Sequence, residues 1–423
     1  MATPSRETFV ALDWLRFALA IYLVMFHTLK NYPEVQALPM VHSLLSLGFF
    51  STSTFFVLSG FLLTHVYLGP GRRAEINKKS FFIKRLSSLY PIHILALLLA
   101  IPLALTASGS MGTVMVDHNV NGWHMNAPET QAYALDTTGW LVNLGLNLSL
   151  LQAWNPLYTV FNQPAWSLSA LLFFYITFPY LAPRLRATYR PALLLTVLCL
   201  LYLTPSLYMF FSDTVTPIAH GMMHRNPLLR LPEFLAGIVL YRVYDLKPAW
   251  LAALTGHTGK WWSIGFILLC LWATAMLYQF VGGQWYYLVH NGLLLPAQLL
   301  LVMLCARSRL DPRTWSAGVA ARLGIASLSI FALHIPLSMM ASKIEKASYA
   351  LFDIITTDAT LGMLPHLATQ EERSLWVYPI YLAVVIVASA LFQTRLVNRM
   401  RDRLRARFLK PKRGTRTTYS SQA

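Results

Sequence analysis

The first apolar segment, residues 11–27, constrains this chain more than any other feature, because it is hydrophobic enough to cross a bilayer yet carries Asp13, Arg16 and His27. A charged side chain at membrane depth costs about 2.5–3.5 kcal/mol, so such groups face a protein interior or an aqueous cavity. The interval from Arg16 to His27 returns to within ~20° of the same helix face and spans about 16 Å. The segment therefore predicts a transmembrane helix that turns a cation and an imidazole toward the inside of a bundle.

The composition predicts the class of protein. Hydrophobic residues make up 56% and charged residues 12% of the 423 residues, whereas soluble domains hold about 25% charged residues. We therefore expect an all-α fold, a polytopic transmembrane helical bundle of about ten spans of roughly 20 residues each. The expected spans are 9–29, 45–68, 89–107, 164–183, 191–211, 227–245, 261–281, 286–305, 323–342 and 375–394.

The distribution of Lys and Arg predicts the orientation of these spans. The 70–87 connection holds six basic residues and the 184–190 connection holds three, whereas the 108–137 connection holds none. The first two are therefore expected in the cytoplasm and the third outside, which leaves room for one crossing between them. That crossing is assigned to 164–183, and the apolar segment 138–154 is predicted to be re-entrant or interfacial.

The remaining basic residues predict the domain organisation. An integral-membrane domain is expected over 1–395 and a basic cytoplasmic tail over 396–423, with both termini on the cytoplasmic side of a cell inner membrane. The net charge of +17 comes mostly from this inside bias, so the lipid bilayer is an expected partner and nucleic acid is not. The first segment is predicted to be an uncleaved signal anchor. The three cysteines lie in separate apolar segments and predict neither a disulfide nor a thiolate metal site.

Five motifs in order resemble those of the acyltransferase-3 family of integral-membrane O-acyltransferases, and the resemblance covers roughly residues 8–395. The motifs are the opening helix with Arg16 and His27, and the segments 55–63, 166–169, 231–237 and 327–336. The resemblance implies transfer of an acyl group from acyl-CoA, with acetyl-CoA as the expected donor substrate and no metal. It implies as acceptor a hydroxyl of a surface or exported glycan, or of a lipid-linked sugar.

Two departures from the family pattern concern the polar network and the choice of donor. The family has an acidic residue after the Trp-Ser-Leu-Ser run, where this chain has Leu171 and Leu172. The family also tends to have two arginines three residues apart before the third span. Here Arg85 is followed by Ser88.

The implied reaction needs a base for the hydroxyl proton, and His27 is the candidate catalytic residue, either as that base or as a transient acyl carrier. The alternative is a core histidine bonded to a backbone carbonyl. Arg16 is predicted to anchor the phosphates of coenzyme A, with Asp13 orienting it; the alternative is an ion pair that only holds the bundle together. Arg85 either contacts a phosphate or merely follows the positive-inside rule.

Three further residues are predicted to line or support the substrate site. Glu233 lies inside an apolar span and needs a partner, which Arg230 one turn earlier can supply, so a network role is expected rather than direct catalysis. His334 is expected either to bind the acceptor or to make a structural hydrogen bond. Trp166 either stacks on a sugar or anchors the helix at the membrane interface. His220 and His224 have a metal-like spacing, but no metal site is expected there.

Two other functions remain open from the sequence. Intramembrane charges suit a transporter or flippase for a glycan or an acyl carrier equally well, although the inverted repeats that favour transport are not visible. A third option is acylation of a small glycoside. Because the chain ends about 28 residues after the last expected span, direct transfer is expected, unless separate polysaccharide-assembly proteins complete the reaction.

Overall fold

The computed structural model describes residues 8–409 except for 72–74, 106–113, 118–129, 134–135, 158, 213–216, 282–284, 358–359, 365, 367 and 369–372. In this part of the chain the secondary structure is helical apart from one antiparallel pair of strands, β1 (Val114–Asp117) and β2 (Thr130–Tyr133). Both strands belong to the 108–137 connection, most of which lies outside the described residues.

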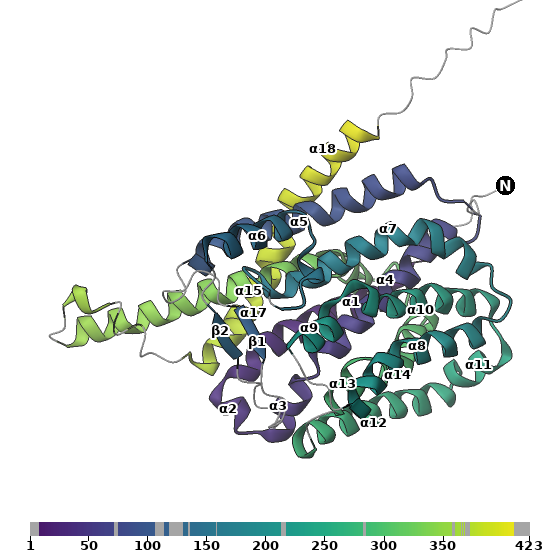
Figure 1. Ribbon diagram of the computed structural model, residues 1–423, viewed down its shortest axis with the longest axis horizontal. Helices are drawn as coiled ribbons and strands as arrows, with labels where there is room; N and C mark the ends of the chain where they lie inside the picture. Colours follow the sequence, from purple (N-terminus) through teal and green to yellow (C-terminus); the bar gives the residue numbers. More distant parts are fainter. Residues whose placement is uncertain are drawn as a thin grey trace, which may run out of the picture.

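The long helices of the bundle overlap the ten expected spans (Figure 1). They are α1 (Val10–His27), α4 (Gly48–Leu68), α5 (Lys78–Leu105), α7 (Trp166–Arg186), α8 (Pro191–Ser212), α10 (Pro227–Leu246), α12 (Gly259–Phe280), α14 (Leu295–Arg307), α15 (Trp315–Thr356) and α17 (Tyr378–Phe392). Shorter helices connect them: α2 (Pro33–Gln36), α3 (Pro39–Leu45), α6 (Thr137–Leu148), α9 (Pro217–Arg225), α11 (Ala249–Thr255) and α13 (Trp285–His290). The last helix, α18 (Asn398–Phe408), follows α17. However, α5 begins 11 residues before the expected 89–107, and α15 is 42 residues long where 323–342 was expected. The expected span 286–305 is divided between α13 and the 13-residue helix α14.

Nine helical segments within the described residues are long and apolar enough to cross a membrane, which confirms the polytopic helical bundle. The one expected span that is not among these nine is 227–245, which corresponds to α10. This helix is 20 residues long but more polar, because it holds Arg230, Glu233, Arg242 and Asp245. Arg230 and Glu233 pair with each other inside the bundle, and Arg242 and Asp245 pair near the end of the helix. α10 therefore lies in the bundle by pairing its charges rather than by lacking them.

The helices α1, α4 and α10 occupy the middle of the bundle, with α5 and α12 on opposite sides (Figure 1). α1 packs along α15 and α4, and α4 packs along α10. Most of α4 is buried because apolar or small residues cover all of its faces, as expected of a helix surrounded by other helices.

Small residues let α4 and α10 approach each other closely. A Cβ atom added to Gly60 would collide with the carbonyl oxygen of Phe234, and one added to Gly237 would collide with the carbonyl group of Val57. Two glycines on facing helices therefore bring the backbones into direct contact, as small residues commonly do in membrane bundles. This contact fixes the position of α10, and therefore of Arg230, relative to α4.

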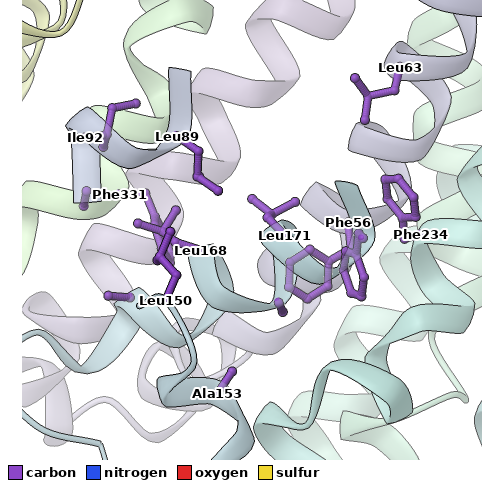
Figure 2. Close-up of a cluster of buried hydrophobic side chains, with 14 of the residues drawn as sticks. Phe56, Leu63, Leu89, Ile92, Leu150, Ala153, Leu168, Leu171, Phe234 and Phe331 are labelled. Carbon is purple, nitrogen blue, oxygen red and sulfur yellow. The ribbon is translucent and has the colours of Figure 1, made fainter. Parts of the chain in front are cut away.

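A large cluster of buried side chains joins α4, α5, α7, α10 and α15 (Figure 2). Leu171 of α7 belongs to this cluster together with Phe56 and Phe234. The position where the family has an acidic residue is thus an apolar side chain of this cluster in this chain, and it also lines a cavity that contains Arg16 and Arg85.

The segment 138–154 does not cross the bundle. Its helix, α6, is 12 residues long, or about 18 Å at 1.5 Å per residue, whereas a bilayer core is about 30 Å thick. The segment is held against α5 at two points. His93 Nε2 lies 2.7 Å from the carbonyl oxygen of Asn147, and the Tyr90 hydroxyl donates to the carbonyl of Leu148 over 3.0 Å.

We expect Gly237→Val to destabilise the protein by about 1–3 kcal/mol or more, because the added side chain forces the backbones of α4 and α10 apart. Gly265→Val is the matched control, since an added Cβ at Gly265 of α12 meets no atom within 4 Å. Thermal unfolding of the two purified variants in detergent measures the effect. Equal unfolding temperatures for the two variants would show that the close contact is unimportant.

Candidate functional site

Two adjoining cavities lie along the face of α1 that carries Arg16 and His27. The first, here called the arginine cavity, has a volume of about 440 Å³ and is lined by Asp13, Arg16 and Arg85 among others. The second, here called the histidine cavity, has a volume of about 290 Å³. Its polar lining includes His27, Lys30, Trp166, His220, His224, Arg230 and His290. Both cavities are lined by Leu23, Thr52 and Phe331, so only a shared wall separates a cationic chamber from a histidine-rich one.

The arginine cavity holds two cations and one carboxylate. Arg16 Nη1 lies 3.7 Å from Asp13 Oδ1, and both side chains are about a third exposed. Arg85 Nη2 donates to the Tyr67 hydroxyl over 3.0 Å, and its guanidinium lies over the Tyr67 ring. The buried Nε of Arg85 has no hydrogen-bond partner among the described residues. The structure therefore brings together the three residues predicted to bind the donor, and it leaves a donor group of Arg85 available.

His27 lies at the last turn of α1, where its imidazole lines the histidine cavity. Within the described part of the chain, no hydrogen bond joins this ring to another side chain or to a carbonyl. The alternative of a core histidine, which requires a bond to a backbone carbonyl, is therefore not supported. A neutral imidazole in this position keeps a lone pair for a proton from a bound hydroxyl.

His334 of α15 stands behind His27, with the two ring centroids 5.1 Å apart. His334 Nδ1 lies 2.7 Å from the carbonyl oxygen of Phe331. Because a carbonyl only accepts, Nδ1 carries the proton and Nε2 keeps a lone pair, which is buried without a partner among the described residues. His334 is fully buried and lines neither cavity. It thus makes the structural hydrogen bond, while the prediction that it contacts the acceptor gains no support.

Trp166 begins α7 and lines the histidine cavity, where its ring lies 4.9 Å from that of His224. Only 7% of the residue is exposed, which argues against a role as an anchor at the membrane interface. The indole instead lines the same cavity as His27.

Glu233 has the partner that the sequence suggested, since Arg230 Nε donates to Glu233 Oε2 over 3.0 Å with both side chains fully buried. Arg230 Nη2 donates to Ser53 Oγ over 2.8 Å, and the Tyr202 hydroxyl donates to Glu233 Oε1 over 2.6 Å. Arg230 lines the histidine cavity, whereas Glu233 lines neither cavity. Glu233 therefore acts on the site through Arg230.

The same network continues from Tyr202 to a pair of histidines. Asn291 Nδ2 donates to the carbonyl of Met223 over 2.7 Å, which fixes the orientation of the amide, and also to the Tyr202 hydroxyl over 3.3 Å. Asn291 Oδ1 lies 2.6 Å from His290 Nδ1, and His290 Nε2 lies 3.0 Å from His224 Nδ1. These contacts form one chain of hydrogen bonds from the buried ion pair to the wall of the histidine cavity.

This chain sets the tautomer of each histidine. An amide oxygen only accepts, so His290 Nδ1 carries a proton and its Nε2 accepts from His224 Nδ1. The neutral His224 ring then presents an unprotonated Nε2. Burial, together with the neighbouring His290 and Arg225, holds the pKa of His224, in the connecting helix α9, well below its usual range, which favours this neutral form. The cavity therefore contains a second imidazole lone pair besides that of His27.

The sequence did not single out Tyr202, His290 or Asn291. The only available signal was a polar side chain inside an apolar segment, and nothing in the spacing joins residues so far apart. His220 and His224 were noticed for their spacing alone. In the described part of the chain, no three His, Cys, Asp or Glu side chains are placed to hold a metal ion.

A cation-lined cavity beside a histidine-lined cavity inside a membrane bundle suits the transfer of a group from an anionic donor. The comparisons define the class. The family model described as an acyltransferase domain matches residues 9–394, so the chain belongs to the acyltransferase-3 family of membrane O-acyltransferases.

Two relatives illustrate this membership. The chain is similar to Acyltransferase MdmB of Streptomyces mycarofaciens, with 25% identity over 340 residues that cover 75% of each chain. It is 23% identical over 339 residues to a putative O-acetyltransferase of Staphylococcus aureus strain COL, and these residues cover 76% of this chain but 49% of the relative. No solved structure matches the chain.

We expect Glu233→Gln to lower the free energy of unfolding by about 3–5 kcal/mol, because it leaves the charge of Arg230 buried without compensation. Asp245→Asn is the control, since Asp245 is a partly exposed carboxylate that bridges Arg186 and Arg242, and its loss should cost at most about 1 kcal/mol. Chemical unfolding in detergent compares the two. The network assignment fails if both variants are equally stable.

Proposed function

We propose that this acyltransferase moves an acetyl group from acetyl-CoA to a hydroxyl of a surface or exported glycan, or of a lipid-linked sugar. One observation carries the proposal: the arginine cavity and the histidine cavity meet at Leu23, on the face of α1 between Arg16 and His27. A movement of the side chains in this shared wall would let an extended thioester arm reach from a cationic anchor to an imidazole within one protein interior. The name O-acetyltransferase of one relative supports acetyl as the transferred group.

The donor site is assigned to Arg16 and Arg85. Guanidinium groups bind phosphates through paired hydrogen bonds, and coenzyme A carries phosphates at its adenosine end. Asp13 lies 3.7 Å from Arg16 and orients it. The interval of about 16 Å between Arg16 and His27 along the helix is comparable to the length of an extended pantetheine arm.

The reaction centre is assigned to His27. Its imidazole takes the proton of the acceptor hydroxyl while the hydroxyl oxygen attacks the thioester carbonyl. The carbon–sulfur bond then breaks, and the thiolate of coenzyme A takes the proton back from the imidazolium. Trp166 and His224 lie side by side in the lining of the same cavity, where they would hold the sugar by stacking and through the lone pair of His224 Nε2.

The proposed orientation follows the distribution of charge. Both termini lie in the cytoplasm of a cell with the protein in its inner membrane, so the arginine cavity opens toward the cytoplasmic pool of acetyl-CoA. The histidine cavity then lies toward the outer side, where exported glycans are assembled. Transport of a glycan or of an acyl carrier loses support, because the family is one of acyltransferases.

We expect His27→Ala to reduce acyl transfer by about 10²–10⁴-fold, since a positioned base contributes that much, while the protein still accumulates in the membrane. The assay incubates membranes of producing cells with radiolabelled acetyl-CoA and measures label in the glycan and lipid-linked fractions. His257→Ala, at an exposed position between α11 and α12, is the control and should transfer normally. Normal transfer by a correctly inserted His27→Ala protein would remove His27 from the mechanism.

A further inference from the structure

The helix α18 of the basic tail continues α17 through the helical turn Gln393–Val397 and contacts α5 as it leaves the bundle (Figure 1). Its residue Arg405 makes the contact through three hydrogen bonds. Arg405 Nε donates to Ser87 Oγ over 3.1 Å, and Nη2 donates to the carbonyl oxygen of Lys84 over 3.1 Å and to Ser88 Oγ over 2.8 Å. The guanidinium is therefore fixed beside the helical turn that carries Arg85.

The charges around Arg405 are unbalanced. The positive charges of Arg401 and Arg85 repel that of Arg405, and the charge of Arg85 also repels that of Arg16. The carboxylate that acts on Arg405 is Asp402, which already pairs with Arg401 at 2.9 Å and is mostly exposed to solvent. Like charges held close together repel each other. A bound anion would relieve this repulsion.

A second observation points to the same ligand. The Nε of Arg85 is buried without a hydrogen-bond partner among the described residues, although the side chain lines the arginine cavity. An unused donor on one guanidinium, with a second guanidinium held nearby, matches a phosphate or pyrophosphate group, which accepts several charge-assisted hydrogen bonds at once.

We propose that Arg405 is part of the donor site and that α18 brings it beside Arg85 so that the two guanidinium groups bind the phosphates of coenzyme A. The proposal rests on the proposed use of acyl-CoA. It also accounts for Ser88. This small residue follows Arg85 by one turn and leaves space for a guanidinium that comes from 317 positions later in the chain.

The competing explanation is that Arg405 only docks α18 on α5. Two variants distinguish the contact between α18 and α5 from the positive charge of Arg405. Arg405→Ala removes both the contact and the charge. Arg405→Ala combined with Ser88→Arg returns a guanidinium to the same place from α5 without restoring the contact with α18. Arg403→Ala is the matched control, because Arg403 lies on the same helix and is exposed.

The experiment measures binding of coenzyme A to the full-length protein in nanodiscs by calorimetry, with phosphate-free pantetheine as a second probe. We expect Arg405→Ala to weaken binding of coenzyme A by about ten-fold, as the loss of one charge-assisted contact does. Arg403→Ala should change it by less than about two-fold, and binding of pantetheine should not respond to Arg405→Ala. The double variant should recover most of the lost affinity. Arg405→Gln, which keeps a donor toward Ser88 but removes the charge, should resemble Arg405→Ala.

The following results would overturn the proposal. Unchanged binding of coenzyme A by Arg405→Ala would exclude Arg405 from the donor site. Failure of Ser88→Arg to restore affinity, or normal binding by Arg405→Gln, would show that only docking matters. If the wild-type protein bound no coenzyme A, the proposed donor itself would be wrong. If Arg16→Ala weakened binding and Arg405→Ala did not, the error would be confined to the tail helix.

Discussion

The free-energy cost of a charged side chain in hydrocarbon determines where the polar groups of this protein lie. Helix α1 has to turn Arg16 and His27 away from lipid, and their spacing puts both on the face that lines the two cavities. Helix α10 meets the same constraint by pairing Arg230 with Glu233 inside the bundle. The pairing in turn places the guanidinium of Arg230 at the wall of the histidine cavity. The need to keep charged side chains away from lipid therefore determines both how α10 is stabilised in the bundle and which groups line the site.

Close packing makes this arrangement specific. The glycine contacts between α4 and α10 set the depth at which Arg230 enters the site, and Ser53 of α4 accepts a hydrogen bond from its guanidinium. The hydrogen bonds that run from Glu233 through Asn291 to His224 then define which nitrogen of the His290 and His224 rings carries a proton. This wall of the histidine cavity is thus oriented before any substrate binds, which favours catalysis.

Much of this could be predicted from the sequence, because periodicity and composition respond directly to the membrane. The spans, the inward face of α1 and the pairing of Glu233 with Arg230 one turn away all follow from local spacing. The segment 138–154 was also separable from the true spans by its flanking charges. The orientation of the bundle in the membrane and the chemical roles of the site residues remain predictions.

The rest depended on contacts between distant parts of the chain. The pairing of His224 with His290 joins positions 66 apart, and Arg405 meets Ser88 across 317 positions. No local pattern marks such contacts. For His334 the sequence left acceptor binding and a structural hydrogen bond equally open, and the structure shows a hydrogen bond to the carbonyl of Phe331 with the ring beside His27.

The central claim is that the acyl arm passes from the arginine cavity to the histidine cavity past Leu23, and Leu23→Trp tests it most directly. The larger side chain should close the passage, so that acetyl transfer from radiolabelled acetyl-CoA is lost while coenzyme A still binds with near wild-type affinity. Leu23→Ala, which leaves the passage open, should retain transfer. Transfer at the wild-type rate by a folded Leu23→Trp protein would contradict the account, because the donor and the imidazole would then have to meet by another route.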